Sequence, residues 1–342
     1  MDRIILWQAN RAIAFILFAV FIRPAEPLYP LPRKYRGRGK YKCVCSGQAK
    51  ANIQLLTTKR GLCRTIAVLM TTMQLEQASR PAVWLPAVSL CRRELVRFVR
   101  QPNRVIGALA TPLVFWLLIG GGMGSSFQIK EMAGGQNYIQ YFFPGTIVMI
   151  LLFTAIFSTI SIIEDRREGF LQSVLVAPVS RMAIVLGKVL GGTLLAFAQG
   201  AIFLALAPTV GIHLGVTSIL LTLAMMFILS FALTGLGFCI AWRMSSTQGF
   251  HAIMNLFLLP LWFLSGALFP MDRAWGVLRW VMMLNPVTYG LSAIRRALYW
   301  GQPMGNHLPG MGLSLTVSVV FALGMFLAAS AIAGGRVSAD LQ

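Results

Sequence analysis

Charged residues are scarce in this chain of 342 residues, of which 12% are Asp, Glu, Lys or Arg and 57% are apolar. A soluble globular domain carries about 25% charged and about 45–50% apolar residues. The shortage of charge therefore excludes an ordinary soluble enzyme and favours a polytopic membrane protein. Disorder is excluded for most of the chain as well, because disorder requires low hydrophobicity.

Acidic residues are the scarcest charged type, with 10 Asp and Glu against 30 Lys and Arg, so the formal net charge is +20. An excess of Lys and Arg can indicate nucleic-acid binding, but in membrane proteins it marks cytoplasmic loops and contacts with anionic lipids. We therefore expect these residues to contact the lipid bilayer and no nucleic acid. The long apolar runs contain no Asp or Glu. Their absence argues against an intramembrane enzyme and against proton coupling. An ion-coupled secondary transporter or channel that uses backbone carbonyls remains the alternative.

A nucleotide site is lacking too. A phosphate-binding loop needs Gly-x-x-x-x-Gly-Lys-Ser/Thr, and the Gly-Lys pairs of this chain are followed by Tyr41 and Val189. We therefore expect no cofactor on this chain and no catalytic residue. The five cysteines and three histidines show no zinc-ligand spacing, which predicts free thiols and no metal site.

Long apolar runs are what the chain does have. A transmembrane helix needs about 20 apolar residues, and six uncharged stretches approach or exceed that length, at residues 105–123, 142–163, 189–210, 216–242, 250–269 and 311–335. The predicted fold class is an all-α polytopic membrane protein with six transmembrane helices. Small residues within the spans favour close helix packing.

Orientation follows from the Lys and Arg residues near the spans. With the N-terminal side taken as cytoplasmic, that side receives eleven: Arg92, Arg93, Arg97, Arg100, Arg104, Arg166, Arg167, Arg181, Lys188, Arg243 and Arg336. The opposite side receives five: Lys130, Arg273, Arg279, Arg295 and Arg296. The excess predicts that both ends of the six-span domain are cytoplasmic.

Residues 1–72 do not match the rest. Their apolar stretch is interrupted by Gln8, Asn10 and Arg11 and is too short to span, and the basic, Pro- and Gly-rich residues 23–42 predict disorder. Three interpretations of residues 1–72 stay open. They arise from a translation start assigned too far upstream, they contain a seventh hydrophobic element, or they form a basic cytoplasmic tail. The predicted divisions are residues 1–72, a cytoplasmic lead and connecting helix at 73–104, the six-span domain at 105–336 and a cytoplasmic tail at 337–342.

Residues 91–104 have the pattern of an amphipathic helix. Cys91, Leu95 and Phe98 form an apolar stripe, and about 200° away lies a basic stripe that includes Arg93, Arg97 and Arg100. Such a helix lies in the membrane interface with its arginines toward anionic headgroups. A solvated charged helix leading into the first span is the alternative.

The loop at residues 164–181 begins with charges and continues with an apolar face of Phe170, Leu171, Val174 and Leu175, until Pro178 stops the helix. This short helix either lies on lipid or offers its face to a groove of a soluble partner. In the second case Glu164 and Arg167, at its base, tie it to the membrane domain.

The longest outer loop runs from residue 271 to 310. Residues 274–284 are apolar but too short to cross, so we expect a re-entrant segment, with Arg295 and Arg296 reaching to the headgroups or contacting substrate. Among polar residues of the spans, we expect Asn255, Thr154 and Ser158 as candidates for a translocation pathway. Hydroxyls that bond to their own helix are the ordinary alternative for Thr154 and Ser158.

Three segments resemble one family. Residues 164–181, followed by Ile-Val-Leu-Gly-Lys at 184–188, resemble the cytoplasmic loop of the type-2 ABC exporter permeases, typically E-R-x-x-G-T-L-E-x-L-x-x-x-P. Leu-Ser-Gly-Ala-Leu-Phe-Pro at 264–270 and Asn-Pro-Val-Thr-Tyr-Gly-Leu-Ser-Ala-Ile-Arg at 285–295 are two further matches. The resemblance covers roughly residues 88–336. Phe170 stands where Thr is usual and Gln172 where an acid is usual, so no salt bridge from Gln172 to a partner is implied.

The resemblance implies a permease half of the bacterial inner membrane that forms a homodimer or heterodimer. Two separate ATP-binding subunits would hold ATP and Mg and drive outward transport of a hydrophobic or amphipathic compound, a lipid or a glycan. Residues 164–181 would be the coupling element to the ATPase, and residues 91–104 the connecting helix.

Overall fold

The computed structural model of the chain describes residues 83–123, 137–177, 179–271, 274–301 and 309–335. The chain divides into two compact units, Met1–Thr72 and Met73–Gln342, and the described residues belong to the second. The expectations for residues 1–72 and 337–342, and for Lys130, Pro178, Arg273 and Arg336, lie outside the described residues.

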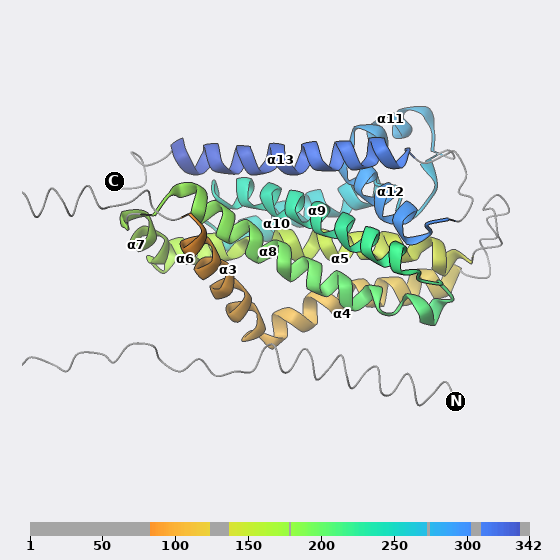
Figure 1. Ribbon diagram of the computed structural model, residues 1–342, viewed down its shortest axis with the longest axis horizontal. Coiled ribbons are helices and arrows are strands. Elements are labelled where there is room, and N and C mark those ends of the chain that lie inside the picture. The colour runs from red at the N-terminus through yellow and green to blue at the C-terminus, as the bar shows by residue number, and fades with distance from the viewer. Residues whose placement is uncertain (1–82, 124–136, 178, 272–273, 302–308, 336–342) are drawn as a thin grey trace, which may run out of the picture. The chain divides into compact units, whose positions relative to one another are not determined.

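The described residues form helices and contain no strand (Figure 1). In chain order these are α3 (Trp84–Val99), α4 (Pro102–Met123), α5 (Tyr138–Ser158), α6 (Ile160–Arg167), α7 (Phe170–Val176), α8 (Arg181–Leu204), the 3-10 turn η1 (Ala207–Val210), α9 (Val216–Ala241), α10 (Thr247–Phe263), α11 (Gly276–Leu284), α12 (Pro286–Leu298) and α13 (Met311–Gly335). Side chains close several helix starts: Ser180, Ser246 and Asn285 each accept a hydrogen bond from a backbone N–H in the first turn.

The predicted all-α membrane fold is confirmed. Four stretches of the described residues are long and apolar enough to cross a membrane: Tyr138–Arg167, Arg181–Val210, Val216–Ala241 and Met311–Gly334. They correspond to the second, third, fourth and sixth predicted spans. The first predicted span is α4, with 22 residues, and the fifth is α10, with 17. The number six stays a prediction.

The predicted end of the fifth span is wrong. The apolar run continues to residue 269, but α10 ends at Phe263 and the next residues form a turn in which Gly266 has a φ of 84°. Backbone carbonyls released by the turn are bound by side chains, since the Tyr141 hydroxyl donates to the Gly266 oxygen at 3.1 Å and the Tyr138 hydroxyl to the Leu268 oxygen at 3.2 Å. Irregular backbone of this kind is tolerated at membrane depth where protein covers it.

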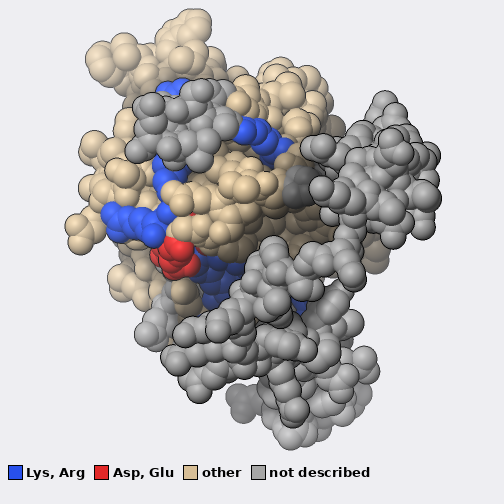
Figure 2. Space-filling model, turned by 90° about the vertical axis from the view of Figure 1, so that its left-hand side faces the viewer, with Lys and Arg blue, Asp and Glu red and all other residues tan. Residues whose placement is uncertain are grey.

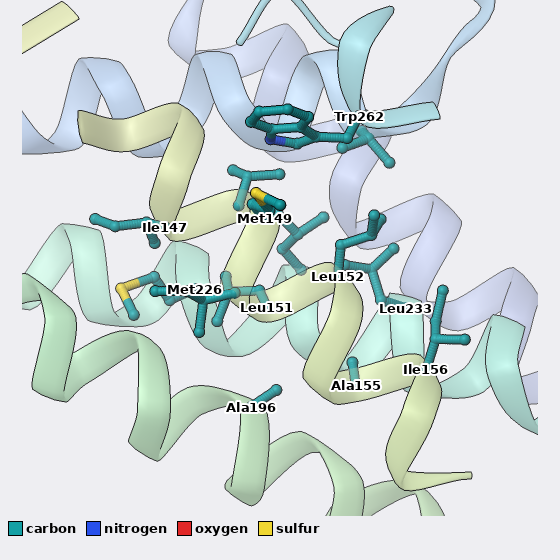
Figure 3. Close-up of a cluster of buried hydrophobic side chains, with 14 of the residues drawn as sticks. Ile147, Met149, Leu151, Leu152, Ala155, Ile156, Ala196, Met226, Leu233 and Trp262 are labelled. Carbon is teal, nitrogen blue, oxygen red and sulfur yellow. The ribbon is translucent and has the colours of Figure 1, made fainter. Parts of the chain in front are cut away.

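Helix α5 forms the centre of the core. It packs against α4, α8, α9, α10 and α12, and its side chains are buried along nearly its whole length. Figure 3 shows α5 residues such as Ile147, Leu151 and Ile156 meeting side chains of α8, α9 and α10. A helix that is apolar all round is expected in such a position.

Helix α3 docks closely on the first half of α8. A Cβ atom at Gly187 would lie 2.7 Å from the Ala87 carbonyl oxygen, and one at Gly191 would lie 2.8 Å from Cβ of Glu94. The apolar stripe expected to face lipid is turned inward instead: Cys91 and Phe98 are buried. The apolar residues that α3 does expose are Trp84, Leu85, Val88, Val96 and Val99.

Helices α11 and α12 follow the turn after α10 and have 9 and 13 residues, both too short to span a bilayer. Trp280 of α11 and Trp275, the residue before that helix, are exposed, whereas α12 is buried against α9 and α13. The expectation that Arg295 reaches the headgroups is wrong, because its side chain is buried within the bundle.

Candidate functional site

The segment between the second and third spans forms a short helix, α7, at one end of the bundle (Figure 1). Gly169 precedes it with a φ of 75°, a left-handed conformation that glycine adopts without a Cβ penalty. The chain therefore turns sharply between α6 and α7. This places α7 directly after the charged end of the second span.

The apolar face of α7 already packs on its own chain. Leu171 is 3% exposed, and Phe170, Val174 and Leu175 are half-buried against the core. Leu171 was expected to contact a soluble partner. In this structure its side chain is buried against the chain's own core, so it is not accessible to a partner. The side of α7 that remains exposed carries Gln172, Ser173 and Val176.

Beside α7 lies a set of seven charged side chains, which we call the charge cluster. Arg93, Glu94 and Arg97 come from α3, and Lys188 comes from α8. Glu164 and Asp165 come from α6, and Glu168 is the residue directly after that helix. Four carboxylates face three cations. The cluster joins three helices that are far apart in the sequence.

Asp165 is the centre of the charge cluster, and its side chain is fully buried. Both terminal nitrogens of Arg93 donate to its two oxygens, at 2.8 and 2.7 Å, and Arg97 donates to Oδ1 at 2.8 Å. Lys188 donates to Oδ2. Bidentate pairs of this kind are among the stronger hydrogen bonds in proteins, and those with Asp165 raise the pKa of the Arg93 guanidinium above its usual value.

Lys188 and Glu94 form the second buried pair. Lys188 is 6% exposed and Glu94 is 5% exposed, and the ammonium group donates to Glu94 as well as to Asp165. A buried charge without a partner would be strongly unfavourable. Arg97 extends the charge cluster outward, donating to Glu164 at 2.9 Å and to Glu168 at 3.4 Å. The Arg93 guanidinium also lies 3.6 Å from the centre of the Phe170 ring, which joins the charge cluster to α7.

Three arginines connect the same segment to the ends of other helices. Arg166 donates at 2.7 Å to the carbonyl of Trp242, the C-cap residue of α9, and Arg167 donates at 3.1 Å to the Ser245 carbonyl in the link between α9 and α10. Arg181 donates to the Ala333 carbonyl at 2.8 Å, at the end of α13. Cations are favourable at helix C-termini, where carbonyl groups lack partners within the helix. The segment from α6 to the start of α8 is thus attached to α3, α9 and α13.

Figure 2 shows this end of the molecule with several basic patches and one small acidic patch. The exposed cations of the described segments here are Arg92, Arg100, Arg167 and Arg243, and the acids that reach the surface are Glu164 and Glu168. No three His, Cys, Asp or Glu side chains in the described part of the chain gather closely enough for a metal ion.

The structure brings together only part of the predicted site. Arg93, Arg97, Glu164 and Phe170 meet at the charge cluster, whereas Arg100 is exposed beyond it. Arg93 and Arg97 bind carboxylates of the protein itself, so the predicted headgroup contact is not what these two residues do here.

The pathway candidates are separated. Thr154 is buried and donates to Gln199 of α8, while Ser158 donates to the Ala155 carbonyl of its own helix. Asn255 lies on the exposed side of α10. The three residues therefore line no common surface within one copy of the chain.

Sequence reasoning missed Glu94, Asp165 and Lys188 as partners. A signal was present on α3, because Ala87, Leu90, Cys91, Glu94 and Phe98 are all buried and recur at helical spacing. An acid within an apolar stripe requires a cation. The sequence does not say which cation, since Lys188 lies 94 residues further along the chain.

Comparisons with known proteins agree with this architecture. The family model described as ABC-2 type transporter matches residues 87–299. The chain is 30% identical over 210 residues to a protein of Cyanophora paradoxa named transport permease ycf38, covering 60% of this chain and 71% of that protein. It is 24% identical over 230 residues to nodulation protein J of Rhizobium meliloti (strain 1021), covering 67% of this chain and 84% of that protein.

Proposed function

The chain belongs to the ABC-2 type transporter family, and from this we propose that it is the permease of an ATP-driven exporter whose ATPase is a separate subunit. ATP and Mg would be bound by that subunit, and this chain would contribute no catalytic residue. The proposed cargo is a hydrophobic or amphipathic compound, a lipid or a glycan, moved outward across the bacterial inner membrane. The relative named transport permease supports the transport role.

The observation that carries the proposal is the position of Asp165. This buried carboxylate is bound at once by Arg93 and Arg97 of α3 and by Lys188 of α8, and it lies five residues before the first residue of α7. A partner that moves α7 would therefore move three helices together. Because α6 follows α5 after one residue, the displacement would reach the centre of the bundle.

The exposed side of α7 is the proposed contact with the ATPase. Val176 is 80% exposed and lies on the same helix face as Gln172 and Ser173, since the spacing is four and three residues. This face replaces Leu171 as the docking surface, while Phe170 and Leu175 contribute through their exposed edges. Exposed basic residues at this end, such as Arg167 and Arg243, would surround the contact.

A second copy, or a related permease half, is proposed to cover the exposed side of α10. Ile253, Leu256 and Phe257 are exposed there, and Asn255 lies among them. An amide in hydrocarbon needs a hydrogen-bond partner, and small and polar residues promote helix association in membranes. In such a dimer Asn255 would lie at the interface. Its polar side chain would then face a translocation pathway formed between the two permease halves.

The test compares one substitution at two ends of the molecule. We expect Val176→Asp to abolish copurification of the ATPase and ATP-dependent transport, because a carboxylate replaces an exposed apolar contact. Val277→Asp on α11, also at an exposed valine, is the matched control and should leave copurification unchanged. Both variants should insert normally, since neither side chain is buried. Normal copurification and transport in Val176→Asp would overturn the role proposed for α7.

A further inference from the structure

A buried polar stripe runs along α12. Thr288, Ser292, Arg295 and Tyr299 follow one another at intervals of four, three and four residues, so they share one helix face. All four are buried, and Arg295 is 3% exposed. The hydrogen bonds of the stripe go to α5, to α11 and to the turn after α10. Tyr299 donates to the Gln140 carbonyl, and the Thr288 hydroxyl lies within donating distance of the Met282 carbonyl at 2.7 Å and the Leu264 carbonyl at 3.3 Å.

Arg295 has weak partners for a buried cation. One terminal nitrogen donates to the carbonyls of Tyr141 and Gly266, each at 3.4 Å, and the guanidinium lies 4.2 Å from the centre of the Tyr141 ring. Its Nε has no hydrogen-bond partner, and no described carboxylate lies within ion-pair distance. The Gly266 carbonyl is shared, because the Tyr141 hydroxyl donates to it as well.

The region is therefore rich in donors and poor in acceptors. A guanidinium carries five N–H donors, and the Ser292 hydroxyl, one turn earlier on the same face, is also buried without a partner. A cation–π contact compensates for only part of the desolvation of a charge. Ionisable residues buried inside membrane proteins pair with one another or with backbone carbonyls, and they commonly mark substrate or ion pathways.

We propose that Arg295, with the Ser292 hydroxyl, binds the anionic headgroup of the transported amphipathic compound, a phosphate, sulfate or carboxylate. The inference rests on the function proposed above. On binding, the guanidinium would exchange the two carbonyls for two oxygens of the anion, the planar geometry for which arginine is suited. The Tyr141 ring would remain stacked on the guanidinium and hold it in place.

Two other arrangements would satisfy the same groups. A buried water could bridge Nε of Arg295 and the Ser292 hydroxyl. A carboxylate of the outer loops could serve as the counter-ion, and the sequence holds two there, Glu131 and Asp272, both outside the described residues. Each alternative predicts that added anions have no effect through Arg295.

The experiment measures the Tm of the full chain in neutral detergent with and without dodecyl phosphate, and needs no ATPase. The expected result is a rise of about 3 °C or more at saturating ligand for the wild type. Arg296→Gln is the matched control and should show the same rise, because Arg296 donates to the Pro309 carbonyl outside the stripe. Arg295→Gln should show no rise. Because no partner subunit takes part, failure here is distinguishable from failure of the proposed export function.

Several results would overturn the inference. These are an absence of any rise in the wild type, an equal rise in Arg295→Gln, or an equal rise with inorganic phosphate, which would remove the need for an amphipathic ligand. If Arg295→Gln does not fold, Arg295→Lys and Ser292→Ala take its place, and an undiminished rise in both contradicts the proposal. Asp272→Asn and Glu131→Gln are each combined with Arg295→Gln. If either carboxylate variant lowers the Tm and this loss is not additive with that of Arg295→Gln, the counter-ion belongs to the protein and the proposal is contradicted.

Discussion

Lys188 and Arg295 are buried cations near opposite ends of the α5–α6 helix pair, and their surroundings differ. Near the end of α6, the charge cluster surrounds three cations with four carboxylates. Near the start of α5, Arg295 meets only carbonyls and an aromatic ring among the described residues. Charges that neutralise one another fix helices in one arrangement, whereas a charge left without a counter-ion favours binding of one. The first end suits transmission of force and the second suits recognition.

The largest expected effect is at Asp165. Asp165→Asn leaves the buried Lys188 and the half-buried Arg93 and Arg97 around a neutral group, and breaking a buried ion pair in this way costs about 3–5 kcal/mol. Thermal unfolding in neutral detergent should show a large fall in Tm together with a lower yield. Glu168→Gln, at an exposed member of the charge cluster, is the control and should change stability by about 1 kcal/mol or less. Wild-type stability of Asp165→Asn would show that the two ends do not differ in this way.

Glycine substitutions compare packing at the two ends. A Cβ at Gly187 meets the Ala87 carbonyl oxygen at 2.7 Å, which is backbone, whereas a Cβ at Gly290 meets a methyl of Leu229 at 2.7 Å, which is a movable side chain. Gly187→Ala should therefore lower stability by about 1–3 kcal/mol. Gly290→Ala should lower it by less, as measured by the same unfolding assay. Equal losses would mean that the two contacts are equally rigid.

A smaller effect is expected at Arg295. Arg295→Met removes a cation–π contact of about 0.5–2 kcal/mol but also removes a buried charge, so the two changes oppose each other. The net change in stability should be about 1 kcal/mol or less in either direction. A loss as large as that of Asp165→Asn would reveal a counter-ion for Arg295 and would remove the contrast between the ends.

The smallest perturbation is a labelling test of which end faces the cytoplasm. In a chain whose Cys43, Cys45 and Cys63 are serine, Gln172→Cys should react with a membrane-impermeant maleimide only from the cytoplasmic side. Trp300→Cys should react only from outside. Cys91 should stay unlabelled at neutral pH, because burial raises the pKa of its thiol. Labelling of position 172 from outside would reverse the orientation.

Local pattern explains which features could be predicted. The spans that contain α5, α8, α9 and α13 follow from apolar runs, and α7 follows from the spacing of Phe170, Leu171, Val174 and Leu175. The end of α10 could not be predicted in this way, because the apolar run continues through the turn. What ends the helix there is the glycine conformation and the carbonyl contacts supplied by Tyr138 and Tyr141.

Pairing across the sequence explains what was missed. Arg93 and Asp165 are separated by 72 residues, and Glu94 and Lys188 by 94, so no periodicity connects them. The basic stripe of α3 was therefore assigned to lipid headgroups. The same error occurred for Arg295: its basic, outer-loop context suggested the membrane surface, although the polar stripe on α12 places it inside.

The distance between Glu94 and Lys188 also has a consequence for synthesis of the chain. At about 5–20 residues per second, the ribosome completes Lys188 roughly 5–20 s after Glu94. During that interval the α3 carboxylate has no lysine to meet, so burial of Glu94 against α8 waits until Lys188 has been made. Docking of α3 is then a late step of biogenesis, completed only when α8 arrives.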